Sequence, residues 1–453
     1  MTTLAALLVP YSGTDAAGAR TLVAAALGLG GDDRPGRAPE GLTVRVDRVQ
    51  PRAGHLSVGL DVAYSTDLGP RRDYLVASDA PVAIAAAHAG RAALLRPAPE
   101  AGDEDDDRRA GSRPGGVAVA EDEAGTRADS VAVWRHPADP ELPGLAAACT
   151  LAAVRAALPD AAGLEVVTYR PLRRAVVRVT AADGSALAYL KVVAPRRLAG
   201  LRARHELVAG APGAVECLGP GVLALTALPG VPLTDRLVAG APVPPLARLR
   251  PRPAGSARSA EPAESAEPAG DMTPTPPGPP AVQAWADTLP TQVDAARGVL
   301  TPATHARLAV LAARAGSSWR RHRDAVGATG LVHGDLHPGN VLLTESGDVA
   351  GHLDLDRAGT GLLVDDDACL LAHTEILALD HPGAGAALAG WWSQVPTDDP
   401  GVLAAMRARV AAVLLTLVPV LAHRASDVLD LAERLLGPVP PPPVGPSQKE
   451  EER

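Results

Sequence analysis

The chain has 453 residues, 47% of them hydrophobic, and a formal net charge of −9, which predicts two or three folded domains and no basic surface for a nucleic-acid partner. Phe is absent and aromatic residues make up only 2% of the chain, so aromatic platforms on which bases could stack are not expected. The 45 glycines and 44 prolines exceed average usage and predict disordered connectors between the folded parts.

Three cysteines lie far apart in the sequence, at Cys149, Cys217 and Cys369. This odd and scattered set favours neither a disulfide framework nor a metal site of closely spaced cysteines, so we expect a reducing, cytoplasmic location. No basic segment precedes the apolar start of the chain, and no stretch is expected to be long enough to span a bilayer. We therefore expect neither secretion nor membrane insertion.

Residues 1–100 are predicted to form an α/β accessory domain. Its helix and its strands are expected near residues 21–29, 42–49, 56–64 and 74–77. Residues 101–130 are predicted to be a disordered acidic linker, because their charged, apolar-poor composition cannot form a core.

Residues 131–230 are predicted to form a second, strand-rich region that begins with a strand and a helix. Two β-type runs, residues 175–180 and 185–193, are joined across Asp183-Gly184, a strong hairpin signal, and the second run carries Lys191. A short helix is then expected at residues 201–208 and a strand at 221–228.

Residues 241–280 are rich in Pro and Ala and poor in large apolar residues, so we expect a disordered insertion. Residues 281–437 are predicted to be mainly helical, and Thr301-Pro302 is a typical helix start. One face of that helix carries the apolar residues Leu308, Leu311, Ala312, Ala315 and Trp319. Residues 438–453 are predicted to be a disordered tail.

Two residues stand out because their types are nearly absent from the chain. Lys occurs only at Lys191 and Lys449, against 43 Lys and Arg residues together, and Asn occurs only at Asn340. In a chain in which Lys and Asn are replaced wherever another residue works, the ones that remain should include positions where no other residue works. We therefore expect chemical roles for Lys191 and Asn340, although Lys191 alone could also be an edge-strand charge.

The densest polar cluster follows an apolar run and places Asp335, Asn340 and Asp354 on loops at the ends of short strands. Two carboxylates and one amide oxygen are hard ligands that Mg²⁺ prefers when phosphate oxygens complete its coordination. An Asp five residues before an Asn is also the spacing of the kinase catalytic loop, in which Asp accepts the hydroxyl proton and Asn holds metal. A loop Asp and Asn that only stabilise a turn are the simpler alternative.

The segment His333-Gly334-Asp335-Leu336-His337-Pro338-Gly339-Asn340 resembles the signature of the aminoglycoside phosphotransferase family. This resemblance covers roughly residues 131–436, apart from the insertion. It implies an α+β, bilobal protein-kinase-like fold, with a small β-rich N-lobe at residues 131–230 and a mostly helical C-lobe at 281–437. The N-terminal α/β domain would be an addition to that fold.

The same resemblance implies roles for individual residues. Asp335 would be the catalytic base, and Asn340 and Asp354 the metal ligands. Lys191 would hold the ATP phosphates and pair with Glu206. The backbone from Thr226 to Leu228 would bind adenine, and Asp366 or Asp367 would be the family's structural aspartate.

One departure from the family pattern concerns the phosphates of the nucleotide. No glycine-rich loop precedes Lys191, so phosphate cover is expected from backbone N–H groups and from Arg173 or Arg174. Sugar-kinase relatives such as maltokinase and glucosamine kinase carry an extra N-terminal cap, and residues 1–100 resemble such a cap.

We therefore expect an ATP- and Mg²⁺-dependent kinase that phosphorylates a hydroxyl of a small polar molecule, either a sugar or an aminosugar or aminoglycoside, with no nucleic-acid or membrane partner. A cationic acceptor would suit an acidic rim formed after the catalytic loop. That rim would contain Asp356, Asp365, Asp366, Asp367 and Glu375. The pair Trp391-Trp392 could stack on a sugar, but a place in the core is the favoured interpretation.

Two alternative functions remain open at this point. His333, Asp335 and His337 could instead form a metal-dependent hydrolase site, which would leave Lys191 without a role. The missing glycine-rich loop also leaves room for a pseudokinase, a nucleotide-binding or scaffold module without turnover.

Overall fold

The structure, a computed structural model, describes residues 17–28, 41–52, 55–66, 68–97, 117–119, 130–255, 279–396 and 398–437. Most of the predicted linker at 101–130, residues 256–278 of the predicted insertion and the predicted tail at 438–453 lie outside the described residues. The chain divides into two compact units, described separately below. The N-terminal unit comprises Met1–Ala199 and Ala214–Ala227, and the C-terminal unit comprises Gly200–Gly213 and Leu228–Arg453.

The first sheet of the N-terminal unit has six strands in the order β1-β2-β3-β6-β4-β5. These strands are β1 (Thr43–Arg52), β2 (His55–Thr66), β3 (Gly69–Ser78), β4 (Ala93–Pro97), β5 (Val117–Val119) and β6 (Val131–Arg135). The helices α2 (Ala17–Ala26) and α3 (Pro81–His88) pack against this sheet. Val58, Leu60 and Val62 alternate along β2 and are fully buried, as a sheet with one face in a core requires.

The strand β6 changes the predicted domain boundary. The sequence analysis assigned residues 131–135 to the kinase-like N-lobe, but β6 pairs with β3 on one side and β4 on the other. The reason is its composition: Val131, Ala132, Val133 and Trp134 are all buried, so this strand fits the middle of a sheet covered on both faces.

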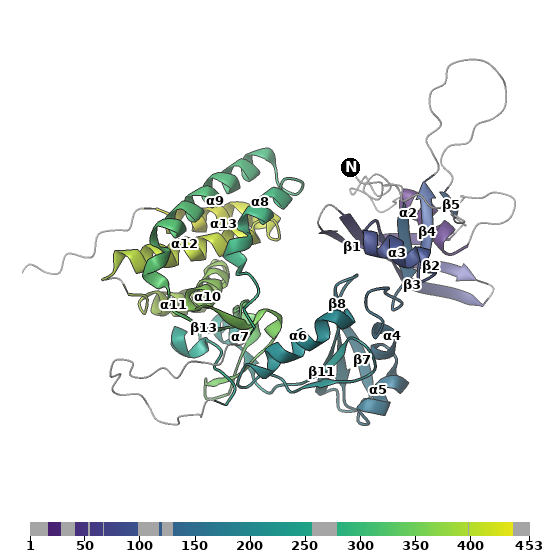
Figure 1. The fold of residues 1–453 in the computed structure, drawn as a ribbon, viewed down its shortest axis with the longest axis horizontal. Helices are drawn as coiled ribbons and strands as arrows, with labels where there is room; N and C mark the ends of the chain where they lie inside the picture. The colour runs from purple at the N-terminus through teal and green to yellow at the C-terminus, as the bar shows by residue number, and fades with distance from the viewer. Residues whose placement is uncertain are drawn as a thin grey trace, which may run out of the picture. The chain divides into compact units, whose positions relative to one another are not determined.

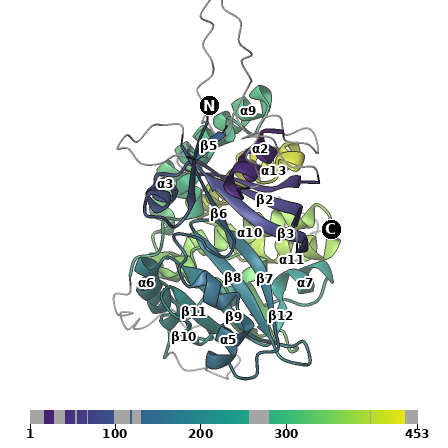
Figure 2. The ribbon, with the colours of Figure 1, turned by 90° about the vertical axis from the view of Figure 1, so that its right-hand side faces the viewer.

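The second sheet of the N-terminal unit has five antiparallel strands in the order β10-β11-β9-β8-β7. These are β7 (Gly163–Arg170), β8 (Arg174–Thr180), β9 (Ala186–Val193), β10 (Ala214–Glu216) and β11 (Val222–Thr226), and Figure 2 shows β7, β8, β9 and β11 side by side. The short helices α4 (Leu145–Ala148) and α5 (Leu151–Ala157) cover one face of the sheet. The predicted hairpin is confirmed, since β8 pairs with β9 and Gly184 turns the chain with φ +82°.

Helix α6 (Pro195–Glu206) follows this sheet, and the chain passes into the C-terminal unit, which is mostly helical. Its helices are α7 (Leu233–Val238), α8 (Leu289–Ala296), α9 (Pro302–His322), α10 (Leu363–Ala378), α11 (Pro382–Trp392), α12 (Pro400–Leu417) and α13 (Ala425–Leu435). Thr301 caps α9 by accepting a hydrogen bond from the N–H of Thr304, as the Thr-Pro signal predicts. The central helix α12 packs against α9 and α13, and the three lie together in Figure 1. The predicted α+β class, strand-rich before the helical part, is confirmed.

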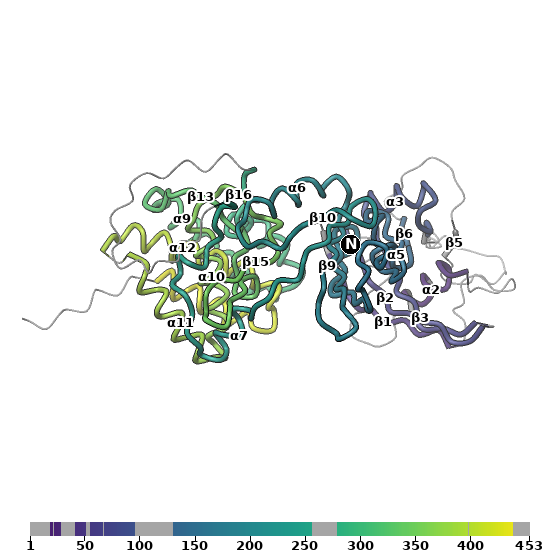
Figure 3. Tube along the Cα trace, turned by 90° about the horizontal axis from the view of Figure 1, so that it is seen from below, coloured from purple at the N-terminus to yellow at the C-terminus, as the bar shows by residue number. Residues whose placement is uncertain are grey.

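Two small antiparallel sheets of the C-terminal unit carry the loops of residues 333–340 and of Asp354. The pair β13 (Thr329–Val332) and β16 (Gly359–Leu362) lies side by side in Figure 3. The second sheet joins β12 (Val231–Pro232), β14 (Val341–Leu343) and β15 (Val349–His352). Two single-turn 3₁₀ helices, η4 (Pro338–Asn340) and η5 (Leu355–Arg357), follow β13 and β15. The loops that bear Asp335 and Asp354 therefore emerge from paired strands.

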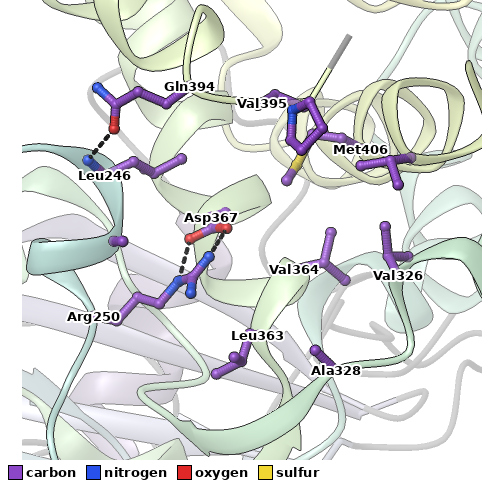
Figure 4. Close-up of a pocket in the computed structure, with 13 residues that line it drawn as sticks. Leu246, Arg250, Val326, Ala328, Leu363, Val364, Asp367, Gln394, Val395 and Met406 are labelled. Atoms are coloured by element: carbon purple, nitrogen blue, oxygen red, sulfur yellow. Dashed lines mark hydrogen bonds and ion pairs between the residues drawn. The ribbon is translucent and has the colours of Figure 1, made fainter. Parts of the chain in front are cut away.

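The expectation of disorder through residues 241–280 is wrong for the described residues 241–255. Leu246–Leu249 form a 3₁₀ helix, η1, whose two leucines belong to the main core of the C-terminal unit. Figure 4 shows the side chain of Arg250 forming an ion pair with Asp367, and Gln394 accepting a hydrogen bond from the N–H of Leu246 at 2.9 Å. The leucines supply the apolar anchor that the average composition of the segment conceals.

The expectation that no stretch is long enough to span a bilayer is also wrong. Helix α12 is long and apolar enough to do so by length and composition alone, but 61% of its 18 residues are buried inside the unit. A helix that is apolar on all sides is expected where neighbouring helices surround it, as α9, α10 and α13 surround α12.

Candidate active site

The segment of residues 333–340, predicted to be a catalytic loop, begins in a tight loop after β13. Gly334 has φ +77°, and a Cβ atom at this position would lie 2.7 Å from the backbone oxygen of Arg357. Only glycine fits such a combination of positive φ and close backbone approach. The glycine of the motif thus permits the loop that follows β13 to turn Asp335 away from the strand.

Asp366 on α10 holds this loop from behind. Its two carboxylate oxygens accept hydrogen bonds from the backbone N–H groups of His333 at 2.6 Å and of Gly334 at 2.9 Å. Asp366 is completely buried, and burial raises the pKa of its carboxyl to about 7 although the two backbone bonds oppose this. Asp367 instead pairs with Arg250, so Asp366 is the aspartate of this pair that supports the loop.

His333 is a structural residue of the loop. Its Nε2 lies 2.8 Å from the backbone oxygen of Leu353, and its Nδ1 accepts a hydrogen bond from the N–H of Asp335 at 3.3 Å. Burial lowers the pKa of His333 to about 3, so the ring is neutral, with one donor and one acceptor both in use. His337 uses its Nδ1 to accept from the N–H of Gly339.

These contacts argue against the hydrolase alternative. The two histidines use ring nitrogens to bind the loop itself, and the described residues contain no group of three or more His, Cys, Asp or Glu side chains placed to hold a metal ion. A hydrolytic zinc site normally needs three such protein ligands.

Asp335 projects from this loop with one carboxylate oxygen engaged. Its Oδ1 accepts a hydrogen bond of 2.7 Å from Nε1 of Trp285. Burial raises the pKa of Asp335, while the nearby His337, Trp285 and Arg357 oppose the rise. A carboxylate with a raised pKa and one oxygen held by a donor suits a general base, because the other oxygen remains to take up a proton.

Asn340 is tied to the same loop. Its side-chain Nδ2 donates to the backbone oxygen of Asp335 at 2.9 Å, which leaves the amide oxygen on the opposite side. The backbone oxygen of Asn340 accepts from the N–H of Leu353 at 2.8 Å, so the residue just before Asp354 lies against Asn340. Asp354 itself adopts a left-handed conformation, with φ 52° and ψ 52°.

This donor set fits a magnesium ion. Asn340 would supply an amide oxygen and Asp354 a carboxylate. Mg²⁺ usually binds only a few protein oxygens of this kind, and phosphate oxygens and water molecules complete its coordination.

The predicted nucleotide residues lie mainly in the second sheet of the N-terminal unit. Lys191 is on β9, between Val176 of β8 and Leu223 of β11, and is only 3% exposed. Arg173 and Arg174 lie at the turn that joins β7 to β8. A lysine buried in the middle strand of a sheet is not the edge-strand charge of the simpler alternative.

The turn between β7 and β8 has a backbone that is already engaged. The N–H of Leu172 donates to Oδ2 of the buried Asp139 at 2.9 Å, and the N–H of Arg173 donates to the oxygen of Arg170 at 3.0 Å. These two backbone N–H groups therefore do not serve as the expected cover of the phosphates, and the role of the Arg173 and Arg174 side chains stays a prediction.

The remaining predicted nucleotide residues lie where the chain passes from one unit to the other. Thr226 ends β11, and the chain enters the C-terminal unit at Leu228. Glu206 lies at the end of α6, in the portion assigned to the C-terminal unit, and its exposed carboxylate accepts from Nε of Arg202 at 2.8 Å. The pairing of Glu206 with Lys191 stays a prediction.

The expectation of an acidic rim is wrong, because most of the acidic residues in it have structural partners. Asp365 pairs with Arg409, Asp366 binds the loop backbone, Asp367 pairs with Arg250, and Glu375 accepts a hydrogen bond from Trp392. Buried and paired carboxylates do not project a field that could attract a cationic substrate. Trp391 is 2% exposed and belongs to the core, as favoured from the sequence.

Sequence reasoning missed Trp285, Arg357 and Asp139. Trp285 is one of only five tryptophans and follows a Pro- and Ala-rich segment that is poor in large apolar residues. This contrast was the signal that could have identified it. Arg357 follows the predicted metal ligand Asp354 closely in the chain, and its Nε donates to the oxygen of Gly334 at 3.0 Å. Asp139 had no signal, since one Asp in a Pro-rich turn is ordinary.

A cavity of about 240 Å³ lies elsewhere in the C-terminal unit, around the Arg250–Asp367 pair. Figure 4 shows its mainly apolar lining, which includes Leu246, Val364 and Met406. Asp335, Asn340 and Asp354 are not among its lining residues, so we do not assign it to the reaction.

In a comparison with known protein families, residues 70–394 match the family model that is described as the phosphotransferase enzyme family. Among solved structures, the aminoglycoside phosphotransferase APH(3'')-Id from Streptomyces rimosus is 22% identical, with a TM-score of 0.36 over 59% of this chain and 95% of that one. The aminoglycoside phosphotransferase APH(4)-Ia is 15% identical, with a TM-score of 0.38 over 62% and 96%. A macrolide 2'-phosphotransferase type I is 16% identical, with a TM-score of 0.33 over 64% and 96%. No curated protein matches the chain.

Proposed function

Because the chain belongs to the phosphotransferase enzyme family, we propose that it transfers the γ-phosphoryl group of ATP to a hydroxyl of a small polar molecule. The observation that carries this proposal is the loop of Asp335 and Asn340. It presents a carboxylate with one oxygen held by Trp285, and an amide whose nitrogen is held by the Asp335 carbonyl. These two bonds support the proposal that the loop holds a base, Asp335, and a metal ligand, Asn340, close together.

In the proposed reaction, Asp335 orients the acceptor hydroxyl and takes its proton on the carboxylate oxygen not bonded to Trp285. The hydroxyl oxygen forms a bond to the γ-phosphorus while the bond between that phosphorus and the β,γ-bridging oxygen breaks. The products are the phosphorylated acceptor and ADP, and the proton leaves Asp335 to solvent. Positioning and charge stabilisation supply most of the rate in such transfers.

Asn340 and Asp354 would hold Mg²⁺, which when bound neutralises the charge of the phosphate oxygens. We assign Lys191 to the α and β phosphates, because a compact ammonium retained in an almost lysine-free chain suits a phosphate. Arg173 and Arg174 would add positive charge at the turn before β8, and the backbone from Thr226 to Leu228 would bind adenine. Glu206 would orient Lys191.

For the acceptor we propose a sugar or aminosugar, supported by the resemblance of residues 1–100 to the cap of sugar kinases. The acidic residues after the loop no longer support a cationic acceptor, since Asp367 pairs with Arg250 and Asp365 pairs with Arg409. We also propose a cytoplasmic location, which is compatible with three cysteines that form no disulfide.

The experiment that tests the proposal is a screen for acceptor-dependent ADP release with MgATP. Sugars, aminosugars, aminoglycosides and amino alcohols would be offered at equal concentration, and hits confirmed by the mass of the phosphorylated product. We expect turnover with at least one sugar or aminosugar. MgATP binding without turnover on any acceptor would favour the pseudokinase alternative, and activity only on amino alcohols would contradict the sugar assignment.

A further inference from the structure

We propose that Trp285 is a positioning residue that fixes the side chain of the catalytic base Asp335 for proton transfer. This inference rests on the proposed function and adds a residue to it that lies 50 positions away in sequence. Its basis is the 2.7 Å hydrogen bond from Nε1 of Trp285 to Oδ1 of Asp335.

The bond gives the two carboxylate oxygens different roles. An indole N–H can only donate, so Oδ1 is fixed as the acceptor of that bond, and the other oxygen is left to receive the hydroxyl proton. An Asp side chain bonded at one oxygen also loses rotational freedom before the substrate arrives. Preorganisation of this kind lowers the barrier without changing how tightly ATP binds.

Trp285 is in turn held against the catalytic loop. The guanidinium of Arg357 lies over the indole ring, 4.3 Å from its centroid, and Nε of the same arginine donates to the backbone oxygen of Gly334 at 3.0 Å. Arg357 therefore links the indole to the residue directly before Asp335. A cation over the face of Trp is a favourable contact, and it leaves the N–H edge of the ring aimed at the carboxylate.

The short 3₁₀ helix η2 (Trp285–Thr288) that carries the indole is anchored in the core. Asp287 pairs with Arg409 at 2.5 Å, and Arg409, only 3% exposed, also pairs with Asp365 of α10 at 2.6 Å. The hydroxyl of Thr288 donates to the oxygen of Trp285 at 2.7 Å. Moving η2 would take one of its two carboxylate partners from the buried Arg409 and would also take the buried Ala286 out of the core, so the indole is held in place.

The test compares two substitutions that differ in the N–H group. Trp285→Phe keeps an aromatic ring and removes the donor. Trp285→His keeps a donor, because Nε2 occupies the same place in its five-membered ring as Nε1 does in the indole. Trp392→Phe is the matched control, since it removes another Trp–carboxylate bond, to Glu375 at 3.0 Å, remote from the loop in sequence and contacts.

We expect Trp285→Phe to lower kcat about 10- to 100-fold, the worth of one hydrogen bond to a charged group, with an unchanged KM for ATP. Trp285→His should recover a large part of kcat, and Trp392→Phe should keep the wild-type value. In the Asp335→Asn background, Trp285→Phe should have little further effect, because the two residues act as one unit. Folding of each variant is checked by its melting temperature.

Three results would overturn the inference while leaving the proposed function intact. These are wild-type kcat in Trp285→Phe, equal losses in the Phe and His variants, and a full additional loss when Trp285→Phe is combined with Asp335→Asn. Absence of turnover in the wild-type protein with every acceptor would instead overturn the proposed function, and this inference with it.

Discussion

The side-chain amide of Asn340 donates a hydrogen bond of 2.9 Å to the backbone oxygen of Asp335. The proposed metal ligand therefore braces the residue that we assign as the base, and the five-residue spacing between them has a direct structural cause. The same bond uses the nitrogen of the amide, so the amide oxygen would be the atom that binds the proposed metal ion.

Replacement of Asn340 by Ala should damage both stability and catalysis. The free energy of unfolding should fall by about 0.5–1.5 kcal/mol, because the carbonyl of Asp335 loses one of two donors and keeps the N–H of His337 at 3.0 Å. Turnover should fall further than stability explains, since a metal ligand is also removed. Denaturant unfolding and steady-state kinetics measure the two effects.

Gln394→Ala is the matched control for this prediction. Gln394 is another amide that bonds a backbone group, the N–H of Leu246, but it does not touch the catalytic loop. It should lose stability and keep turnover. An Asn340→Ala protein with normal turnover would contradict the assignment of Asn340.

Lys191→Ala should abolish most of the rise in melting temperature that MgATP gives to the wild-type protein. Lys191→Arg should restore little of it, because a planar guanidinium is larger than an ammonium and Lys191 is only 3% exposed. Thermal unfolding with and without millimolar MgATP is the measurement. Lys449→Ala, which changes the only other lysine, should behave like wild type, and an undiminished shift in Lys191→Ala would refute the phosphate assignment.

The sequence was most informative where local chemistry decides the structure. The Thr301-Pro302 helix start and the Asp183-Gly184 hairpin are both present, because capping and turn preferences operate between neighbouring residues. The scarcity of Lys and Asn in the chain singles out Lys191 and Asn340 without any knowledge of contacts.

The sequence was least informative where distant segments meet. The bond of Trp285 to Asp335 joins residues 50 positions apart, and no local pattern encodes it. The acidic residues after the catalytic loop were taken for a rim because their arginine partners, Arg250 and Arg409, lie more than 40 positions away. Charge patterns in sequence cannot separate a solvated cluster from several buried ion pairs.

The buried carboxyl of Asp366 should make stability depend on pH. Its pKa is about 7 in the folded protein against 3.8 as the ordinary value, so the folded state binds this proton more tightly. The stability that this proton contributes to the folded state is fully present below about pH 4 and is lost as the pH rises through about 7. The free energy of unfolding of wild type minus that of Asp366→Asn should therefore fall between pH 4 and pH 7. Parallel curves for the two proteins would contradict this.

The inserted segment should be dispensable only in part. Deletion of residues 256–278, with the ends joined by a short Gly-Ser linker, should leave the melting temperature nearly unchanged. Met272 is the only large apolar side chain in this segment, so its composition cannot contribute a core. Deletion of 252–278 should destabilise the protein, since the backbones of Arg252 and Ala254 bond to Ala209 and Leu207. Equal melting temperatures for the two deletions would show that these backbone contacts contribute nothing.

The most direct test of the central claim follows the γ-phosphate itself. With an acceptor from the screen and ATP labelled at the γ position, wild-type protein should place the label on the acceptor. Asp335→Asn should transfer it about 10²- to 10⁴-fold more slowly at unchanged ATP affinity, the usual loss of a general base, whereas Asp354→Ala should weaken binding of MgATP. Equal transfer rates in wild type and Asp335→Asn, or equal losses of ATP affinity in both variants, would contradict the assignment of Asp335 as the base.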